Sequence, residues 1–311
     1  MSGFRLIAFL QTVCLVCAAG CSQGEAPIKI SLANRETVRT APHSDQEKPL
    51  RIAVGGMITP QEGFVYYKEF LDYLGEKIGR PVQFVDKEKY EEVNNLLKSG
   101  DIDVAFVCSG PYVDGHDEFG LELLAAPQAY GKTVYYSYII AERDSPIADF
   151  EELRGKTFAF ADPQSNSGTL VPTYMLSRLH ETPDSFFKQY VYTYAHDKSI
   201  VAVAQKVVDG AAVDSLIWEY LNRANPKFTS KTKIIAKSPP YGIPPVVARK
   251  GLDRKLKKAL HDALVNAHND ERGRELLNSM MIDRFVDIRD SDYDSVRAMK
   301  VWLARQKRKG A

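Results

Sequence analysis

A segment from Thr157 to Thr169 brings several uncharged hydrogen-bond donors together where a strand pattern changes into a helix pattern. The donor side chains are those of Ser165, Asn166, Ser167 and Thr169. The first N–H groups of a helix have no carbonyl partner within it and lie at the positive end of its dipole, so they favour an anion. Gly168 lacks a Cβ and would let an oxyanion approach the backbone. Simple helix capping remains the alternative, although one such residue is enough for a cap.

An acceptor is expected beside these donors if the bound oxyanion keeps a proton. A protonated oxygen must donate to an acceptor, and a carboxylate there also repels a fully deprotonated competitor. Asp214 follows the apolar run 211–213 and is the candidate for this role. Capping of the helix expected after it is the alternative role of Asp214.

Strand and helix patterns alternate along most of the chain, which predicts parallel βαβ units. Helices are expected over 64–78, 90–98, 169–179, 199–208, 216–223, 253–267, 271–280 and 293–306. Strands are expected over 50–54, 81–85, 102–107, 157–161, 190–194, 211–213, 234–237 and 246–248. Ligands of such open α/β sheets bind at the carboxyl ends of the strands, so the donor segment lies where a site is expected.

Two crossings are expected to divide the chain into two α/β lobes. The aromatic run 134–141 has no helix before it and predicts the first crossing, and the breaker-rich segment 239–245 predicts the return. We therefore predict one lobe from 49–137 and 242–311 and a second lobe from 138–241. Two lobes joined by two crossings form a hinged clamp around a ligand.

The first 20 residues predict export. An apolar stretch after Arg5 is too short to span a bilayer and ends in Ala18-Ala19-Gly20-Cys21, which resembles the lipobox of bacterial lipoproteins. The prediction is a signal peptide over 1–20, an acylated Cys21, and a polar tether over 21–48. An ordinary secretory signal is the alternative. Cys108 would then be the remaining thiol, which we expect to be buried and inert.

Charge and motifs argue for a binding protein. The 41 Lys and Arg residues nearly cancel the 40 Asp and Glu residues, leaving a net charge of +1, so nucleic acid is not an expected partner. The sequence contains no HExxH or GxSxG motif and no Cys/His spacing typical of a metal site. We therefore expect no catalytic residue, metal or cofactor, and no enzymatic activity.

Several motifs resemble the PhnD-like family of periplasmic phosphate-, phosphite- and phosphonate-binding proteins of ABC importers. These are Asp162-Pro163, then Ser165-Asn166-Ser167-Gly168, then Pro172, with Asn166 where the family usually has Thr. The leader 150–156 and the segment Ser109-Gly110-Pro111-Tyr112, similar to an aromatic-bearing loop after the third strand, add to the likeness. The resemblance implies a two-lobed periplasmic-binding-protein fold of type II with two hinge crossings.

By this likeness Tyr112 would close over the anion from the first lobe, and His196 would donate to it from the second. A loop aromatic that packs on the rim and a plain helix-start residue are the respective alternatives. Thr59, in the loop after the first strand, should offer a hydroxyl to the same crevice. Family members commonly carry an acidic residue just before the return strand, where this chain reads Ile243-Pro244-Pro245-Val246, a departure that bears most on an aminophosphonate ligand.

Together these features predict a monomeric, lipid-anchored solute-binding protein on the periplasmic or outer face of a membrane. It would capture a small oxyanion, such as phosphate, phosphite or phosphonate, and deliver it to the permease subunits of an ABC importer in the inner membrane. One alternative is a ligand-sensing module for a signalling partner. Another is the same fold with a sulfonate or a different organic anion as its ligand.

Overall fold

The computed structural model describes residues 48–55 and 60–309, and the side chains of the first helix from Tyr67 onward. The predicted signal peptide, Cys21, most of the predicted tether and Thr59 lie outside the described residues.

One half of the described chain is built on a six-stranded mixed sheet in the order β13-β4-β12-β3-β1-β2. Strand β1 pairs in parallel with both β2 and β3, whereas β12 runs antiparallel between β3 and β4. The alternation of short apolar strands with amphipathic helices produces these parallel pairs. The strands are β1 (Leu50–Val54), β2 (Val82–Asp86), β3 (Val104–Phe106), β4 (Glu122–Gln128), β12 (Val246–Ala248) and β13 (Arg284–Val286).

The other half is built on a five-stranded sheet in the order β10-β6-β9-β7-β8. Strand β7 pairs in parallel with β8 and β9, and β6 runs antiparallel to β9 and β10. The strands are β6 (Ser137–Glu142), β7 (Thr157–Phe160), β8 (Gln189–Tyr192), β9 (Gly210–Asp214) and β10 (Thr232–Lys237).

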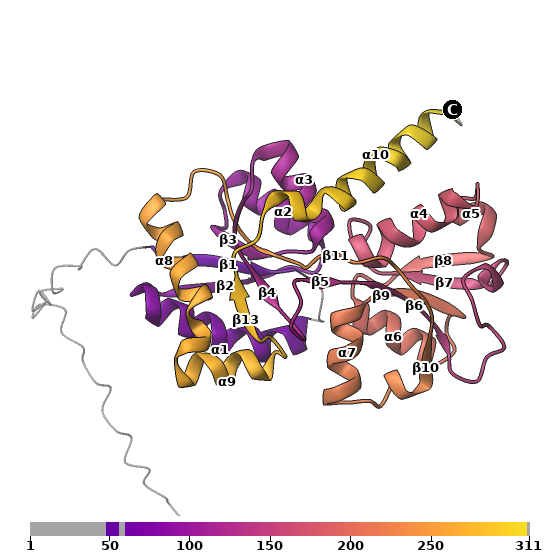
Figure 1. Cartoon of the computed structure of the whole chain (residues 1–311), viewed down its shortest axis with the longest axis horizontal. Helices are drawn as coiled ribbons and strands as arrows, with labels where there is room; N and C mark the ends of the chain where they lie inside the picture. The colour runs from indigo at the N-terminus through magenta and orange to yellow at the C-terminus, as the bar shows by residue number, and fades with distance from the viewer. Residues whose placement is uncertain (1–47, 56–59, 310–311) are drawn as a thin grey trace, which may run out of the picture. The chain divides into compact units, whose positions relative to one another are not determined.

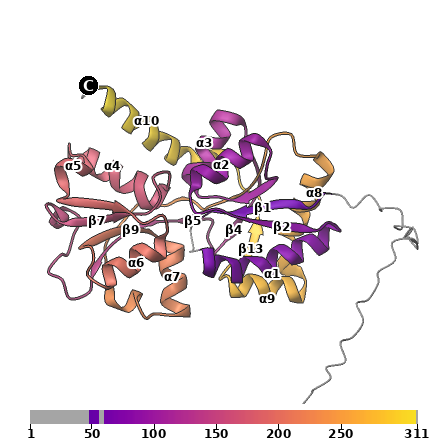
Figure 2. The same ribbon diagram turned by 180° about the vertical axis from the view of Figure 1, so that it is seen from behind.

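Helices cover both faces of each sheet (Figure 1). Around the six-stranded sheet α1, α8 and α9 lie on one face and α2 and α3 on the other; around the five-stranded sheet α6 and α7 lie opposite α4 and α5, as the reverse view in Figure 2 also shows. The helices are α1 (Pro60–Ile78), α2 (Tyr90–Ser99), α3 (Ser109–Phe119), α4 (Val171–Arg178), α5 (Pro183–Phe186), α6 (His196–Ala204), α7 (Ser215–Ala224), α8 (Arg254–Val265), α9 (Glu271–Ser279) and α10 (Asp294–Lys309). Single helical turns are η1 (Glu151–Leu153), η2 (Asn166–Leu170), η3 (Thr229–Lys231), η4 (Ala267–Asn269) and η5 (Asp290–Tyr293).

The chain passes between the two sheets twice, through two short strands that pair with each other. Strand β5 (Val134–Tyr135) runs antiparallel to β11 (Tyr241–Gly242), so both crossings form one two-stranded ribbon. Helix α10 adds a contact from the first half to the second, because the indole N–H of Trp302 donates to Ser177 Oγ of α4 at 3.0 Å. The ribbon lies where the sequence predicts the two crossings.

Three local expectations differ from the structure. Ser109 to Tyr112, expected as a loop, forms the first turn of α3, where Pro111 is tolerated because first-turn N–H groups need no helical partner. The run 134–141 divides into β5 and β6 because the ribbon ends before the second sheet begins. Strand β4 contains Pro127 and was not expected, yet it pairs with both β12 and β13.

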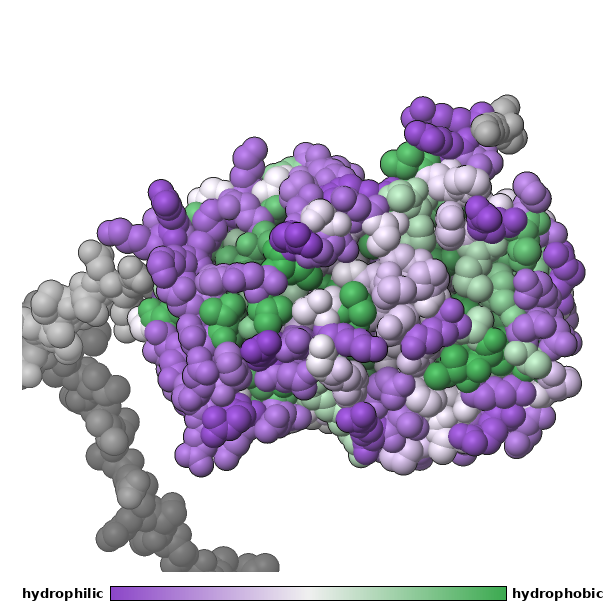
Figure 3. Space-filling model, in the orientation of Figure 1, coloured by the Kyte–Doolittle hydropathy of each residue, from purple (hydrophilic) through white to green (hydrophobic). Residues whose placement is uncertain are grey.

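Hydrophobic side chains concentrate in cores under both sheets. Figure 3 shows mostly hydrophilic residues on one face of the molecule, with hydrophobic residues in small patches between them. Val207 and Val301 are among the few large hydrophobic side chains that are strongly exposed. Within the described residues, no helix combines the length and the apolar character that crossing a membrane requires.

Candidate oxyanion-binding site

The loop between β7 and η2 is held in place by Asp162. Its carboxylate accepts hydrogen bonds from the backbone N–H of Gln164 at 2.7 Å and of Tyr90 at 3.1 Å, and Tyr90 belongs to the other half of the molecule. The Asp162 carbonyl accepts from the N–H of Ser165. Burial raises the pKa of the Asp162 carboxyl, which these backbone donors partly offset. Asp162 therefore fixes the loop and also ties the two halves together.

The helix that follows this loop begins with the π-helical turn η2, which continues into α4. Ser165 is its N-cap and accepts from the Gly168 N–H at 3.0 Å, while the Leu170 N–H reaches the Ser165 carbonyl. Pro172 has no N–H, so it cannot donate to the carbonyl of the preceding turn. Ser137 of β6 replaces that donor, because its hydroxyl donates to the Ser167 carbonyl at 2.6 Å. Ser165 thus binds the N–H groups of Gly168 and Leu170, whereas the N–H groups of Asn166 and Ser167 precede the first helical hydrogen bond and have no carbonyl partner within the helix.

Gly168 allows the closest packing in the site. A Cβ at this position would lie 2.5 Å from the Ala161 Cβ, 3.0 Å from the His196 Cε1 and 3.1 Å from the Ser165 Oγ. Since carbon atoms do not approach this closely without repulsion, only glycine lets η2 lie against α6 here. This contact brings Ser165 and His196 together, with 3.5 Å between Ser165 Oγ and His196 Nε2.

His196, the first residue of α6, is neutral and is held in one tautomer. Its Nδ1 accepts the backbone N–H of Asp214 at 3.0 Å, so the ring proton must lie on Nε2. Complete burial lowers the pKa of His196 to about 3. The Nε2–H therefore faces Ser165 as an uncharged donor throughout the physiological pH range.

Asp214 caps the following helix, and its role as an acceptor for a ligand stays a prediction. One oxygen, Oδ1, caps α7 by accepting from the Leu216 N–H at 2.8 Å. The other, Oδ2, is buried and has no hydrogen-bond partner among the described residues. Burial raises the pKa of Asp214 to about 7. Its carboxyl group is therefore near half-protonation at neutral pH and can either accept or donate at Oδ2.

Other buried polar atoms near the loop also have no partner among the described residues. They include Ser167 Oγ, Asn166 Oδ1 and Tyr90 Oη. The charge of Asp214 adds to burial in raising the pKa of Tyr67, Tyr90 and Tyr135, which places these rings near the carboxyl. Leaving such groups unsatisfied costs about 1–3 kcal/mol each, so their concentration at one place indicates a polar ligand.

The two buried ionisable groups predict opposite effects of pH on stability. Folded protein keeps a proton on Asp214 that the unfolded chain has released, so this contribution is lost as pH rises from about 4 to 7. Between about pH 3 and 6.5 the unfolded chain holds a proton on His196 and the folded protein does not. The contribution of His196 to the unfolding free energy therefore increases with pH over this range. Relative to wild type, Asp214→Asn should gain about 1.4 kcal/mol of unfolding free energy per pH unit between pH 4.5 and 6.5, and His196→Asn should lose as much.

Urea unfolding of the three proteins at pH 4.5, 5.5 and 6.5 measures these slopes. Differences between each variant and wild type that do not change with pH would show that the folded-state pKa values of the two groups are ordinary.

Two predicted site residues use their hydroxyl protons elsewhere. Thr169 Oγ1 donates to the Asp162 carbonyl at 2.8 Å, and so braces the loop. The side chain of Tyr112 points along α3, packs against Tyr293 and donates to Asp290 Oδ1 at 2.7 Å. We correct both assignments to this extent: in this structure neither hydroxyl is available as a donor to an anion. The reason for Tyr112 is that it lies in a helix, which sets the direction of its side chain.

The structure adds site residues that sequence patterns did not identify. Tyr135 Oη accepts from Asn166 Nδ2 at 2.9 Å, and Cys108 Sγ lies 3.8 Å from that oxygen. Cys108 is buried, and burial raises the pKa of its thiol. Tyr90 starts α2 directly after β2, so its place at the carboxyl end of a parallel strand was a usable signal. Tyr135 lies in the crossing and Ser137 is the first residue of β6, and no local pattern marks either of them.

The described site is a cradle of neutral donors with one buried carboxyl group as acceptor. We call it the cradle and define it by Ser165, Asn166, Ser167, Gly168, His196 and Asp214. Uncharged donors at a helix start can replace the hydration shell of an oxyanion in a desolvated space. A cradle of this kind in an α/β chain with two sheets and two crossings defines a two-lobed solute-binding protein.

The chain belongs to the phosphonate periplasmic substrate-binding proteins of ABC transporters, whose family model matches residues 54–293. This assignment confirms the resemblance that the loop motifs indicated, and it implies a location outside the cytoplasm. The phosphonates-binding periplasmic protein of Escherichia coli K12 is 28% identical over 242 residues, which cover 76% of this chain and 71% of that protein. The phosphate-import protein PhnD of Mycolicibacterium smegmatis is 26% identical over 268 residues, covering 78% of this chain and 82% of that protein.

A solved structure supports the fold. The binding protein component of an ABC phosphonate transporter from Pseudomonas aeruginosa matches with a TM-score of 0.79 and 24% sequence identity, covering 83% of this chain and 88% of that one. The predicted α/β fold with two lobes is therefore confirmed. The names of the two relatives describe phosphonate binding and phosphate import, which agrees with a binding role for this chain.

Proposed function

We propose that this protein captures phosphate, phosphite or a phosphonate in the cradle and presents it to the permease subunits of an ABC importer, without catalysing a reaction. The lobes would comprise 49–137 with 242–311, and 138–241, and would close over the ligand about the β5 and β11 ribbon. The division of strands between the two sheets supports these boundaries. The membership of the family and the names of the two relatives support the ligand class.

The observation that carries the proposal is the buried Ser167 Oγ at the start of η2, which, like Asp214 Oδ2, has no hydrogen-bond partner in the described part of the chain. A hydroxyl can donate to a phosphorus oxyanion, and a carboxyl can share a proton with it. A tetrahedral group between them would satisfy both atoms at the positive end of the helix dipole.

Asn166 fits this arrangement after a half-turn of its amide group. As placed, Nδ2 donates to Tyr135 Oη and Oδ1 has no partner. Because an amide and a hydroxyl can exchange donor and acceptor roles, the Tyr135 hydroxyl can donate to Oδ1 when the group is turned. Nδ2 would then lie where Oδ1 lies now, and a donor at that place suits an anion better than an acceptor does.

Calorimetric titration of the chain from Ser22 onward with phosphate, phosphite, methylphosphonate and sulfate tests the proposal. Micromolar affinity corresponds to about −8 kcal/mol, which several charge-assisted hydrogen bonds in a closed site can supply. We expect at least one phosphorus oxyanion to bind at this level and sulfate to bind more weakly, because sulfate brings no proton for Asp214 to accept. Selective binding of sulfate, or no binding of any of these anions, would refute the proposal.

We also propose that Cys21 carries a lipid that anchors the protein after removal of residues 1–20. The motif Ala18-Ala19-Gly20-Cys21 supports this proposal. Cys21→Ala should move the protein from the membrane fraction into the soluble fraction when expressed in a bacterial host, because lipid attachment provides the membrane affinity. Fractionation followed by immunoblotting measures the distribution, with Cys108→Ala as the matched control. A Cys21→Ala protein that still sediments with membranes would show that the anchor is a different one.

A further inference from the structure

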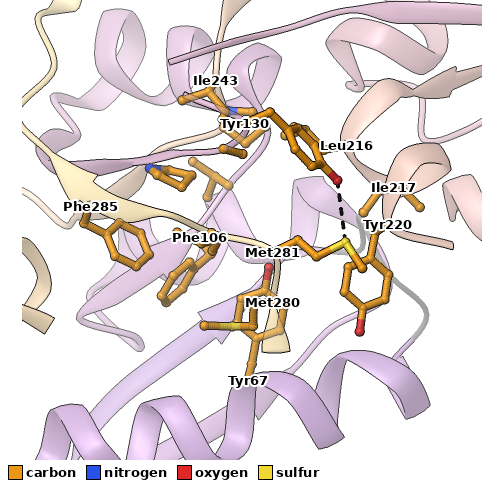
Figure 4. Close-up of a pocket in the computed structure, with 15 residues that line it drawn as sticks. Tyr67, Phe106, Tyr130, Leu216, Ile217, Tyr220, Ile243, Met280, Met281 and Phe285 are labelled. Carbon is orange, nitrogen blue, oxygen red and sulfur yellow. Dashed lines mark hydrogen bonds between the residues drawn. The ribbon is translucent and has the colours of Figure 1, made fainter. Parts of the chain in front are cut away.

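An apolar cavity adjoins the cradle, and its volume is about 70 Å³. Residues of both halves line it: Phe106 and Phe285 of the six-stranded sheet, Ile217 of α7, Ile243 of the return crossing, and Met280 and Met281. Figure 4 shows the rings of Phe106 and Phe285 on one side of the two methionines, and Ile217 and Tyr220 on the other. The cavity is therefore formed where the two halves face each other.

The cavity and the cradle share a wall. Asp214 belongs to the cradle and is the N-cap of α7. Leu216 and Ile217, in the first turn of the same helix, line the cavity. The Leu216 N–H that donates to Asp214 Oδ1 fixes this connection at 2.8 Å. On the opposite side, Tyr67 lines the cavity and is close enough for the charge of Asp214 to raise its pKa. The start of α7 thus places the cavity next to the Asp214 side of the cradle.

The lining is suited to an uncharged group. None of the described residues that line the cavity carries a charged side chain; they are aliphatic, aromatic, proline and methionine residues. At the return crossing the lining residues are Ile243 and Pro244. Moving an ammonium group into such surroundings without a paired carboxylate is costly, whereas an alkyl group gains by leaving water. The flexible methionines can adapt to groups of different shape.

We propose that this cavity is a subsite for the organic substituent of a phosphonate, and that the protein prefers small uncharged alkylphosphonates to aminoalkylphosphonates. This inference rests on the proposed function, since it assumes that the cradle holds the phosphorus group. The volume has room for about five groups the size of a water molecule, which corresponds to a short alkyl chain.

Titration with phosphate, methyl-, ethyl- and propylphosphonate and 2-aminoethylphosphonate tests the proposal on the chain from Ser22 onward. Affinity should rise about threefold to fourfold for each added methylene from methyl to propyl, because each one is transferred from water to an apolar wall. Propylphosphonate and 2-aminoethylphosphonate have nearly the same shape, and the uncharged one should bind at least about tenfold more tightly.

A variant separates the cavity from the cradle. Met281→Glu should reduce the preference for propyl over 2-aminoethyl by about tenfold, because it supplies a carboxylate to pair with the ammonium. Met281→Leu keeps the apolar lining and should leave the preference unchanged. Phosphate has no substituent, so its affinity should change little in either variant and reports an intact cradle.

The outcomes distinguish the two proposals. If the phosphorus anions fail to bind at all, the proposed function is refuted. If phosphate binds but methyl- and propylphosphonate bind equally well, or 2-aminoethylphosphonate binds more tightly than propylphosphonate to wild type, the cradle is upheld and the alkyl subsite is refuted.

Discussion

Replacing Ser165 and Ser167 together by alanine is expected to weaken binding of the phosphorus oxyanion by about 30-fold to 1,000-fold. The Ser167 hydroxyl is buried and has no partner within residues 48–55 and 60–309, and Ser165 Oγ faces the Nε2–H of His196 across 3.5 Å. Each buried donor lost from a ligand contact costs about 1–2 kcal/mol here, and 1.4 kcal/mol corresponds to tenfold. Titration calorimetry with the tightest anion of the wild type measures the change.

The single variants separate binding from folding. Ser165 Oγ caps η2 by accepting from Gly168 N–H, so Ser165→Ala should also lower the unfolding free energy by about 1 kcal/mol. Ser167→Ala removes a hydroxyl with no partner among the described residues and should lower affinity without lowering thermal stability. Ser230→Ala, at an exposed position, is the matched control. An unchanged affinity of the double variant would remove this loop from the binding site.

The affinity of the wild type is expected to fall by about tenfold more than that of Asp214→Asn between pH 7 and 8.5. Burial raises the pKa of Asp214 to about 7 in the free protein, and a bound anion beside Oδ2 would raise this pKa further. The complex therefore holds a proton between Asp214 and the ligand that the free protein has released above pH 7. Binding must recover this proton, at a cost that approaches tenfold in affinity per pH unit.

The comparison with Asp214→Asn isolates the carboxyl group, because ionisation of the ligand itself affects both proteins equally. Asparagine is an equally good N-cap, so α7 should keep its cap through the amide oxygen. The amide N–H₂ can donate to the anion at every pH. Titrations at pH 7.0, 7.75 and 8.5 measure the two profiles, with exposed Asp144→Asn as the control. Parallel profiles for wild type and Asp214→Asn would show that Asp214 does not share a proton with the ligand.

Much of the cradle could be predicted because its signals are local. Ser165, Gly168 and Pro172 lie within one helix start, where capping and the missing proline N–H restrict the backbone to a few conformations. Asp214 was expected either as an acceptor or as a cap, and its Oδ1 accepts from the Leu216 N–H while Oδ2 has no partner among the described residues. Such contacts span only a few residues, so sequence spacing determines them.

Contacts between distant parts of the chain could not be predicted in the same way. Tyr112 donates to Asp290, which is 178 residues further along the chain, and the direction of its side chain depends on α3 packing against that segment. Tyr135 reaches Asn166 only because the ribbon places the crossing beside η2. The apolar character of Ile243 was visible, but its neighbours in the cavity, Ile217 and Met280, come from other elements.

Local patterns along the chain were therefore enough to predict the alternation of strands and helices, the helix start with its donors, the carboxyl group at the end of β9, and the family. These properties follow from backbone preferences and hydrophobic period within short segments. The tertiary structure decided which hydroxyls remain free for a ligand, the tautomer of His196, and the apolar cavity beside Asp214. Each of these depends on which distant side chain removes water or supplies a partner, and only the packing of the two sheets and their helices brings those groups together.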